Sequence, residues 1–156
     1  MKTLTGPQLL LRPFLKTDSV ELARLANNKK IADQVRDIFP HPYTEEDAEQ
    51  FIELQLRYEG APITFCITHH NLLVGVIGLV PQTDVYRFNA EMGYWLGEPY
   101  WGRGFAKEAV GLIVRYAFEE LNFRRIYAGV FDFNEASKRV LLANGFKHEA
   151  IARDKV

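Results

Sequence analysis

The feature that most constrains the fold is an apolar stripe at helical spacing that begins directly after a glycine-rich turn. Its members recur at i, i+4, i+7, i+8, i+11 and i+12, so they share one face of a helix. They are Phe105, Ala109, Leu112, Ile113, Tyr116 and Ala117. Such a face has to be buried against another layer, and the strand-like stretches 88–96 and 125–131 on either side can supply it. The pattern predicts a helix packed on a sheet.

Strand and helix signals alternate along the rest of the chain. Apolar or alternating runs predict strands at 8–15, 63–68, 72–79, 88–96 and 125–131 and from 146 onward. Helices are expected at 18–26, from 44 to before 60, from 102–106 onward and at 134–144. The expected N-terminal caps are Asp18, with Glu21 three residues later, and Thr44. This order predicts an α+β fold with a mixed, mostly antiparallel central sheet flanked by helices.

Length and composition predict a single domain over residues 1–156. With 47% hydrophobic and 13% aromatic residues the chain has ample material for a core. A net charge of −1 gives no overall field toward nucleic acid or an anionic membrane, so neither is expected as a partner. No apolar run approaches the roughly 20 residues of a membrane span, and no signal-peptide core is present. We expect a cytoplasmic protein.

Cysteine and histidine usage gives no sign of a metal centre. The single Cys66 cannot form an internal disulfide, and the four histidines lack the spacing of a helical zinc motif. No histidine is placed to activate Cys66, which therefore reads as a small buried residue on its strand. We expect no bound metal.

The glycine-rich turn at 97–106 has the features of an anion site. A strand ends there and a helix begins, so unpaired N–H groups of the first helical turn carry partial positive charge. Gly102 and Gly104 let a phosphate approach that backbone, and Arg103 and Lys107 add full charges. Residues 101–156 also hold ten Lys/Arg against seven Asp/Glu. The alternative is a turn that only closes a strand–helix unit.

Two familiar phosphate motifs do not fit this turn. A P-loop ends in Gly-Lys-Ser/Thr, whereas Gly102 is followed by Arg103 and Gly104. A dinucleotide fingerprint needs a third small residue where Lys107 stands, and an acidic residue at the end of a strand about 20 residues on, where this chain is still helical. A nucleoside triphosphate or dinucleotide is therefore disfavoured.

The turn resembles the pyrophosphate loop of the GNAT superfamily of N-acetyltransferases, Gln/Arg-x-x-Gly-x-Gly/Ala. The segment 101–106, Trp-Gly-Arg-Gly-Phe-Ala, matches at Gly104 and Ala106, and its first position departs as Trp101. With Gly-Tyr-Trp-Leu at 93–96, Pro-His-Pro-Tyr-Thr at 40–44, Asn-Glu-Ala-Ser at 134–137 and Asn-Gly-Phe at 144–146, it is similar to the branch of the ribosomal-protein N-terminal acetyltransferases. The resemblance spans about residues 8–152 and implies the GNAT acyl-CoA N-acyltransferase fold.

The resemblance implies acetyl coenzyme A as the cofactor. Its pyrophosphate would lie on the turn, and its pantetheine would run beside the strand end at Trp95 and Leu96. Asn134 is expected to cap the following helix and to orient a cofactor amide. The expected cofactor-binding residues are Trp95, Leu96, Trp101, Gly102, Arg103, Gly104, Phe105, Ala106, Lys107 and Asn134.

Transfer of acetyl from sulfur to nitrogen needs a base for the amine and a proton donor for the thiolate. Glu91, on the strand that leads to the turn, matches an acidic position of this branch and is the expected base; the alternative is a solvent-facing strand residue. Many family members donate the proton from a tyrosine where this chain has Leu141. Ser137 is the expected replacement, unless its hydroxyl bonds back within its helix. A backbone N–H near Leu96 would receive the thioester oxygen's charge.

One wall of the acceptor site is expected, by the same resemblance, from a stretch rich in aromatic and polar residues. It comprises Arg36, Asp37, Phe39, His41 and Tyr43. The alternative is an ordinary loop with Phe39 buried.

The sequence thus predicts an acetyl-CoA-dependent N-acetyltransferase that acts on a primary amine by direct attack. The acceptor is hypothesised to be a protein N-terminus, with a small-molecule amine as the alternative. Because Leu141 replaces the usual donor, a non-catalytic acyl-CoA sensor or interaction module is the rival class. The chain also ends at Val156, before the family's final strand. The sheet edge is expected to be open or filled by a second subunit, as in a homodimer, unless the sequence is a shortened form.

Overall fold

A computed structural model describes residues 2–33, 39–128 and 135–147, with one six-stranded sheet in the order β1-β2-β3-β4-β5-β6. The strands are β1 (Leu4–Thr5), β2 (Leu10–Arg12), β3 (Thr64–His69), β4 (Leu72–Pro81), β5 (Asn89–Leu96) and β6 (Arg125–Tyr127). All neighbours pair antiparallel except β5 and β6, which are parallel. The predicted mixed, mostly antiparallel α+β fold is confirmed.

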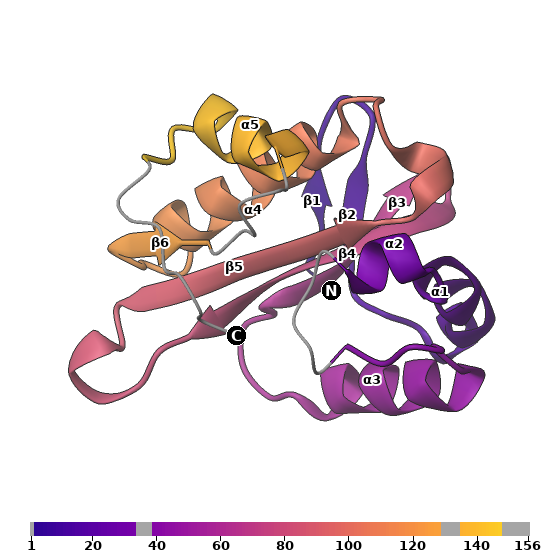
Figure 1. Cartoon of the computed structure of the whole chain (residues 1–156). Helices are drawn as coiled ribbons and strands as arrows, with labels where there is room; N and C mark the ends of the chain where they lie inside the picture. The colour runs from indigo at the N-terminus through magenta and orange to yellow at the C-terminus, as the bar shows by residue number, and fades with distance from the viewer. Residues whose placement is uncertain (1, 34–38, 129–134, 148–156) are drawn as a thin grey trace.

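The helices form a layer on each face of this sheet (Figure 1). They are α1 (Ser19–Ala26), α2 (Lys29–Ala32), α3 (Glu45–Arg57), α4 (Phe105–Glu119) and α5 (Glu135–Ala143), with short 3-10 turns η1 (Lys16–Asp18), η2 (Asp84–Tyr86) and η3 (Glu98–Tyr100). Helices α4 and α5 lie over one face, and α1 and α3 lie under the other. We call these the α4 face and the α3 face.

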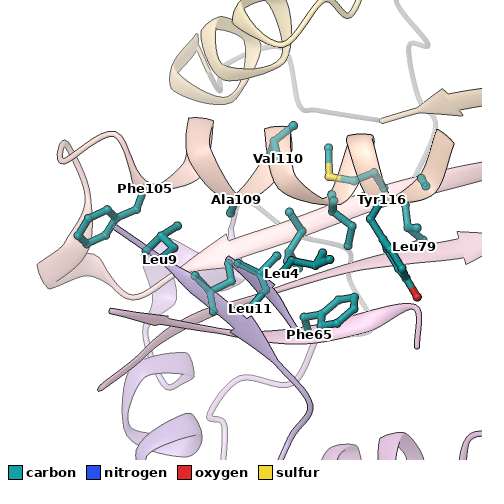
Figure 2. Packing of buried hydrophobic residues seen from close by; sticks show 14 of the residues in the cluster. Leu4, Leu9, Leu11, Phe65, Leu79, Phe105, Ala109, Val110 and Tyr116 are labelled. Carbon is teal, nitrogen blue, oxygen red and sulfur yellow. The ribbon is translucent and has the colours of Figure 1, made fainter. Parts of the chain in front are cut away.

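The predicted stripe of α4 is buried on the α4 face. Phe105, Ala109, Ile113, Tyr116 and Ala117 are at most 4% exposed and Leu112 is half-buried. Figure 2 shows labelled members of this core, which extends to side chains of β1–β4. A second cluster on the α3 face packs α1 and α3 against Cys66 and Val76. Burial of both faces fixes which way each β5 side chain points.

Several predicted boundaries differ from the structure. The strand expected at 8–15 is limited to Leu10–Arg12, because Gly6 and Pro7 turn the chain back from an additional strand, β1, and Pro13 lacks an N–H for pairing. Helix α2 was not predicted; Asn28 caps it by accepting from the Lys30 N–H. Residues 146–147 are not in a strand, and residues 148–156 lie outside the described part of the chain.

The two predicted helix caps have different outcomes. Thr44 caps α3 as expected, in a reciprocal capping box with Asp47. Asp18 is the N-cap residue of α1 as expected, but the predicted capping by its side chain is wrong. Its carboxylate makes no cap bond to α1 and instead accepts from the Leu15 N–H and from Nη1 and Nη2 of Arg12. A buried carboxylate is stabilised more by a charged guanidinium than by a neutral backbone N–H of the helix.

Candidate functional site

The glycine turn keeps open space in front of the first turn of α4. Gly102 and Gly104 have φ values of 76° and 80°, a left-handed conformation that favours glycine. A Cβ atom built on either residue would have no heavy-atom neighbour within 4 Å. Gly104 is the N-cap of α4 and supplies no side-chain hydrogen bond to the helix. The partial positive charge of this helix end therefore faces unfilled space, as an anion site requires.

Charged side chains near the turn are arranged to favour an anion. Arg103 and Lys107 are exposed, and the Arg103 guanidinium lies 5.6 Å from the Tyr100 ring centroid. Glu108, the acidic residue of the first helical turn, accepts hydrogen bonds from the backbone of Leu9 (2.7 Å) and Gln8 (3.0 Å). The Glu108 carboxylate, the acidic group closest to the turn along α4, is therefore hydrogen-bonded to the β1–β2 connection.

The ends of β5 and α4 contribute backbone rather than side chains. Leu96 and Phe105 are 7% and 2% exposed, and both side chains belong to the core. As predicted cofactor-binding residues they can therefore act only through main-chain groups. The Trp101 indole N–H donates to the Leu96 carbonyl at 2.9 Å, which ties the turn to the end of β5.

The backbone of β5 alternates between its two neighbours. The Gly97 N–H donates to Val74 of β4, and Asn89 accepts from the Gln82 N–H, so odd-numbered residues face β4. The N–H and C=O groups of Met92, Tyr94 and Leu96 consequently point toward the β6 side. Described pairing with β6 involves only residues 89–91 of β5. An extended ligand with amide groups can pair along this edge as a strand would.

Two hydroxyl groups meet on the α4 face beside this edge. The oxygens of Tyr94 and Ser137 lie 3.0 Å apart, linking β5 to α5. Burial raises the pKa of Tyr94, and the bond to Ser137 opposes that shift. The sequence predicted either that Ser137 is the proton donor or that it bonds within its own helix. It did not predict the contact with Tyr94. Leu141, where a family tyrosine is common, is buried in the core.

Sequence reasoning did not include Tyr94 in the site. The available signal was its place two residues before Leu96, on the face that strand alternation assigns to the helix of Ser137. Because that helix is distant in sequence, its contact with β5 could not be read from spacing.

The opposite, α3 face of β5 carries Glu91, Gly93 and Trp95. Their cross-strand partners are Val80, Gly78 and Val76, and Val76 belongs to the α3-face core. Glu91 is half-buried, while a Cβ atom at Gly93 would meet nothing within 4 Å. We call Glu91, Gly93 and Trp95 the β5 strip. It is a carboxylate and an aromatic ring separated by open space.

An aromatic wall closes the Trp95 end of the β5 strip. The Phe39 ring centroid lies 6.0 Å from that of Trp95 and 5.1 Å from that of Tyr43. The Tyr43 N–H donates to Asn27, and burial raises the pKa of Tyr43 to about 12. The structure thus brings together two of the predicted wall residues. His41 is exposed, and the remaining predicted residues, Arg36, Asp37 and Asn134, lie outside the described residues.

A polar clamp that the sequence did not reveal holds the turn to α2. The Glu98 carboxylate accepts from Lys30 Nζ and Asn28 Nδ2, each at 2.8 Å. These bonds, first to Lys30 and then to Asn28, lower the pKa of Glu98. The clamp joins the start of the turn to the chain that precedes the aromatic wall.

Cys66 lies away from this chemistry. It is 0% exposed, and burial raises its pKa to about 12, so the thiol is neutral at physiological pH. Among residues 2–33, 39–128 and 135–147 no group of three His, Cys, Asp or Glu is placed to hold a metal. The helices of those segments include none long and apolar enough to cross a membrane.

Most of the chain is similar in sequence to known acetyltransferases. A family model described as acetyltransferase (GNAT) domain matches residues 8–147. Probable N-acetyltransferase YjcK of Bacillus subtilis is 35% identical over 159 residues, covering 98% of this chain and 88% of YjcK. Uncharacterized N-acetyltransferase YoaA of Bacillus subtilis is 42% identical over 81 residues, which span 52% of this chain and 45% of YoaA.

The fold is likewise that of a solved acetyltransferase. RimL, the ribosomal L7/L12 alpha-N-protein acetyltransferase, solved in complex with coenzyme A, superposes with a TM-score of 0.82 at 20% identity, over 96% of this chain and 86% of that one. The chain belongs to the GNAT acetyltransferase family, as the resemblance in its glycine turn predicted.

Proposed function

We propose that the protein transfers acetyl from acetyl coenzyme A to a primary amine by direct attack. The observation that carries this proposal is the unfilled, uncapped start of α4, which directly follows the strand bearing Glu91. This arrangement supports phosphate binding and amine chemistry at one strand, on which two substrates can meet.

The residues present fit coenzyme A. The turn Gly102–Lys107 would hold the pyrophosphate through backbone N–H groups, with Arg103 and Lys107 adding charge. The β6-side edge of Met92–Leu96 would pair with the pantetheine amides, beside Trp95 and Trp101. The bound molecule supplies the activated acetyl thioester.

Three groups of this chain divide the proton and charge transfers. Glu91 takes the proton from the amine through water, so that neutral nitrogen can attack. The Leu96 N–H lies on the β6-side edge, where it can stabilise negative charge on the thioester oxygen. Tyr94, hydrogen-bonded to Ser137, donates a proton to the leaving thiolate. The Tyr94–Ser137 pair takes the place of the donor tyrosine that many family members have where this chain has Leu141.

The acceptor we propose is a protein N-terminus. RimL, which shares the fold, is an alpha-N-protein acetyltransferase by name, and the sequence resembles that branch. The β5 strip leaves room for the amine end of such an acceptor, because a Cβ at Gly93 would meet open space.

The test is acetyl-CoA-dependent thiol release with a panel of N-terminal peptides and small amines. Peptide acetylation, located on the α-amine by mass spectrometry, supports the proposal. Turnover with small amines alone would reassign the acceptor. Tight coenzyme A binding without turnover of any amine would favour the non-catalytic acyl-CoA sensor.

A further inference from the structure

A pocket of about 290 Å³ lies at the start of β5 and β6, beyond the Glu91 end of the β5 strip. Its lining is Gln82, Tyr86, Asn89, Arg125 and Tyr127. We call it the Arg125 pocket. Among the described residues this lining has one charged side chain, the guanidinium of Arg125, and otherwise amide and phenol groups. Such a lining favours a polar ligand with negative charge.

Strand register places this pocket next to Glu91. Asn89 pairs with Arg125, and Glu91 pairs with Tyr127, in the parallel β5–β6 ladder. Paired residues share a face, and so do residues two apart on one strand. Asn89, Arg125 and Tyr127 therefore lie on the α3 face, in line with the β5 strip. Along that face the order is Trp95, Gly93, Glu91 and then the Arg125 pocket.

Two further arginines, Arg87 and Arg124, lie around Phe88 at this end of the sheet and are not among the residues that line the pocket. Arg87 and Arg124 each place a guanidinium carbon 4.6 Å from the Phe88 ring centroid. Within the described segments neither forms an ion pair with a carboxylate; the Arg87 side chain instead donates to the Asp84 backbone carbonyl. Phe88 precedes Asn89 and Arg124 precedes Arg125, so these cations sit at the pocket's end of both strands.

The spacing of the opposite charges defines what they can recognise. Glu91 lies one strand repeat from Asn89, the partner of Arg125, which is about 7 Å. An N-terminal amine at Glu91 would bring the side chain of the second or third peptide residue to the Arg125 pocket, because an extended chain advances about 3.3–3.6 Å per residue. We propose that the Arg125 pocket selects acceptor peptides with an acidic side chain at position two or three. This proposal rests on the proposed function, since it assigns the amine to Glu91.

The test compares amidated peptides Ala-Glu-Ala₄ and Ala-Ala-Glu-Ala₃ with their glutamine counterparts, which differ by one charge. Affinity is measured by calorimetry with coenzyme A present, and kcat/KM by thiol release. Variants are Arg125→Gln and, as a matched control, Arg115→Gln on the exposed side of α4. At least one glutamate peptide should bind about tenfold more tightly than its counterpart. Arg125→Gln should abolish that preference, and Arg115→Gln should retain it.

Outcomes separate this inference from the proposed function. Equal affinity for both members of each pair, or a preference that survives Arg125→Gln, overturns the inference even if acetylation proceeds. A charge preference in binding that depends on Arg125, without turnover of any peptide, supports the pocket and overturns the proposed function. Single-stranded RNA that displaces the peptide only when Arg125 is intact would assign the pocket to a different ligand and overturn the inference.

Discussion

The hydroxyl oxygens of Tyr94 and Ser137 lie 3.0 Å apart and join β5 to α5. Either hydroxyl can donate to the other. The hydroxyl that accepts keeps its own proton, which it can donate to a third group. Tyr94 is half-buried, and burial raises its pKa, which keeps the phenol protonated. In the mechanism we propose, this pair is the proton donor and Glu91 is the base, with the Tyr94 and Glu91 side chains on opposite faces of β5.

Tyr94→Phe removes this donor and is expected to lower kcat by about tenfold or more, because the thiolate then leaves unprotonated. Affinity for acetyl coenzyme A should change little. The readout is thiol release as a function of pH, together with calorimetry. Ser137→Ala, which leaves the phenol in place, should have the smaller effect. A larger loss in Ser137→Ala than in Tyr94→Phe would make the serine the donor.

Glu91→Gln keeps the shape of the side chain and removes the base. Because a positioned base contributes about 10²–10⁴-fold, thiol release should fall well over tenfold while cofactor affinity stays nearly intact. Glu49→Gln, an exposed carboxylate on α3, serves as the control and should behave as wild type. Turnover by Glu91→Gln at the control rate would remove Glu91 as the base.

Gly104→Val is expected to weaken coenzyme A binding by more than tenfold, since it fills the space before α4 and strains a residue at φ 80°. Strain of this kind costs about 1–3 kcal/mol, so the free energy of unfolding is measured alongside affinity. Normal affinity in a folded Gly104→Val protein would contradict the phosphate assignment.

Gly93→Leu provides the complementary change on the β5 strip. Its Cβ enters open space, and the left-handed conformation is not involved, so the fold and cofactor affinity should persist. The added side chain should instead obstruct the acceptor and raise its KM. An unchanged acceptor KM, measured with a saturating acetyl coenzyme A concentration, would place the amine elsewhere.

Asp18→Asn tests the buried ion pair at the base of α1. The Asp18 and Arg12 side chains are 9% and 20% exposed, so loss of the charge leaves a largely desolvated guanidinium without its partner. The expected loss in the free energy of unfolding is about 2–4 kcal/mol. Glu21→Gln, in the exposed pair with Arg24, should cost less than about 1 kcal/mol. Equal losses in urea unfolding would show that burial does not distinguish the pairs.

Cys66 predicts an alkaline loss of stability. Burial raises its pKa from 9.0 to about 12, so its contribution is fully present below pH 9 and declines as pH rises toward 12. At pH 10 the unfolded thiol is ionised and the folded one is not, which costs about 1.4 kcal/mol. Urea unfolding at pH 8 and pH 10 should show this loss in wild type and a smaller one in Cys66→Ala. Parallel declines would assign the loss to other groups.

Much of the fold could be predicted from the sequence, because the helical and the strand patterns of buried residues each repeat within a few positions. The α4 stripe, the 63–79 hairpin and the Thr44 cap each depend on residues a few positions apart, and the structure has all three. The glycine turn was readable for the same reason, since positive φ values favour glycine. The partner of the Asp18 carboxylate was misassigned, because Arg12 lies on the preceding strand.

Short-range spacing along the chain is enough to indicate the sheet and helix layers and the glycine turn, and the resemblance of short motifs indicated the family. The groups that meet across elements could be found only once the chain was folded. Tyr94 with Ser137, Glu98 with Lys30, and Arg125 beside Glu91 depend on strand register and helix docking. The contact between Glu98 and Lys30 joins residues 68 positions apart, and no local pattern encodes a distance of that kind.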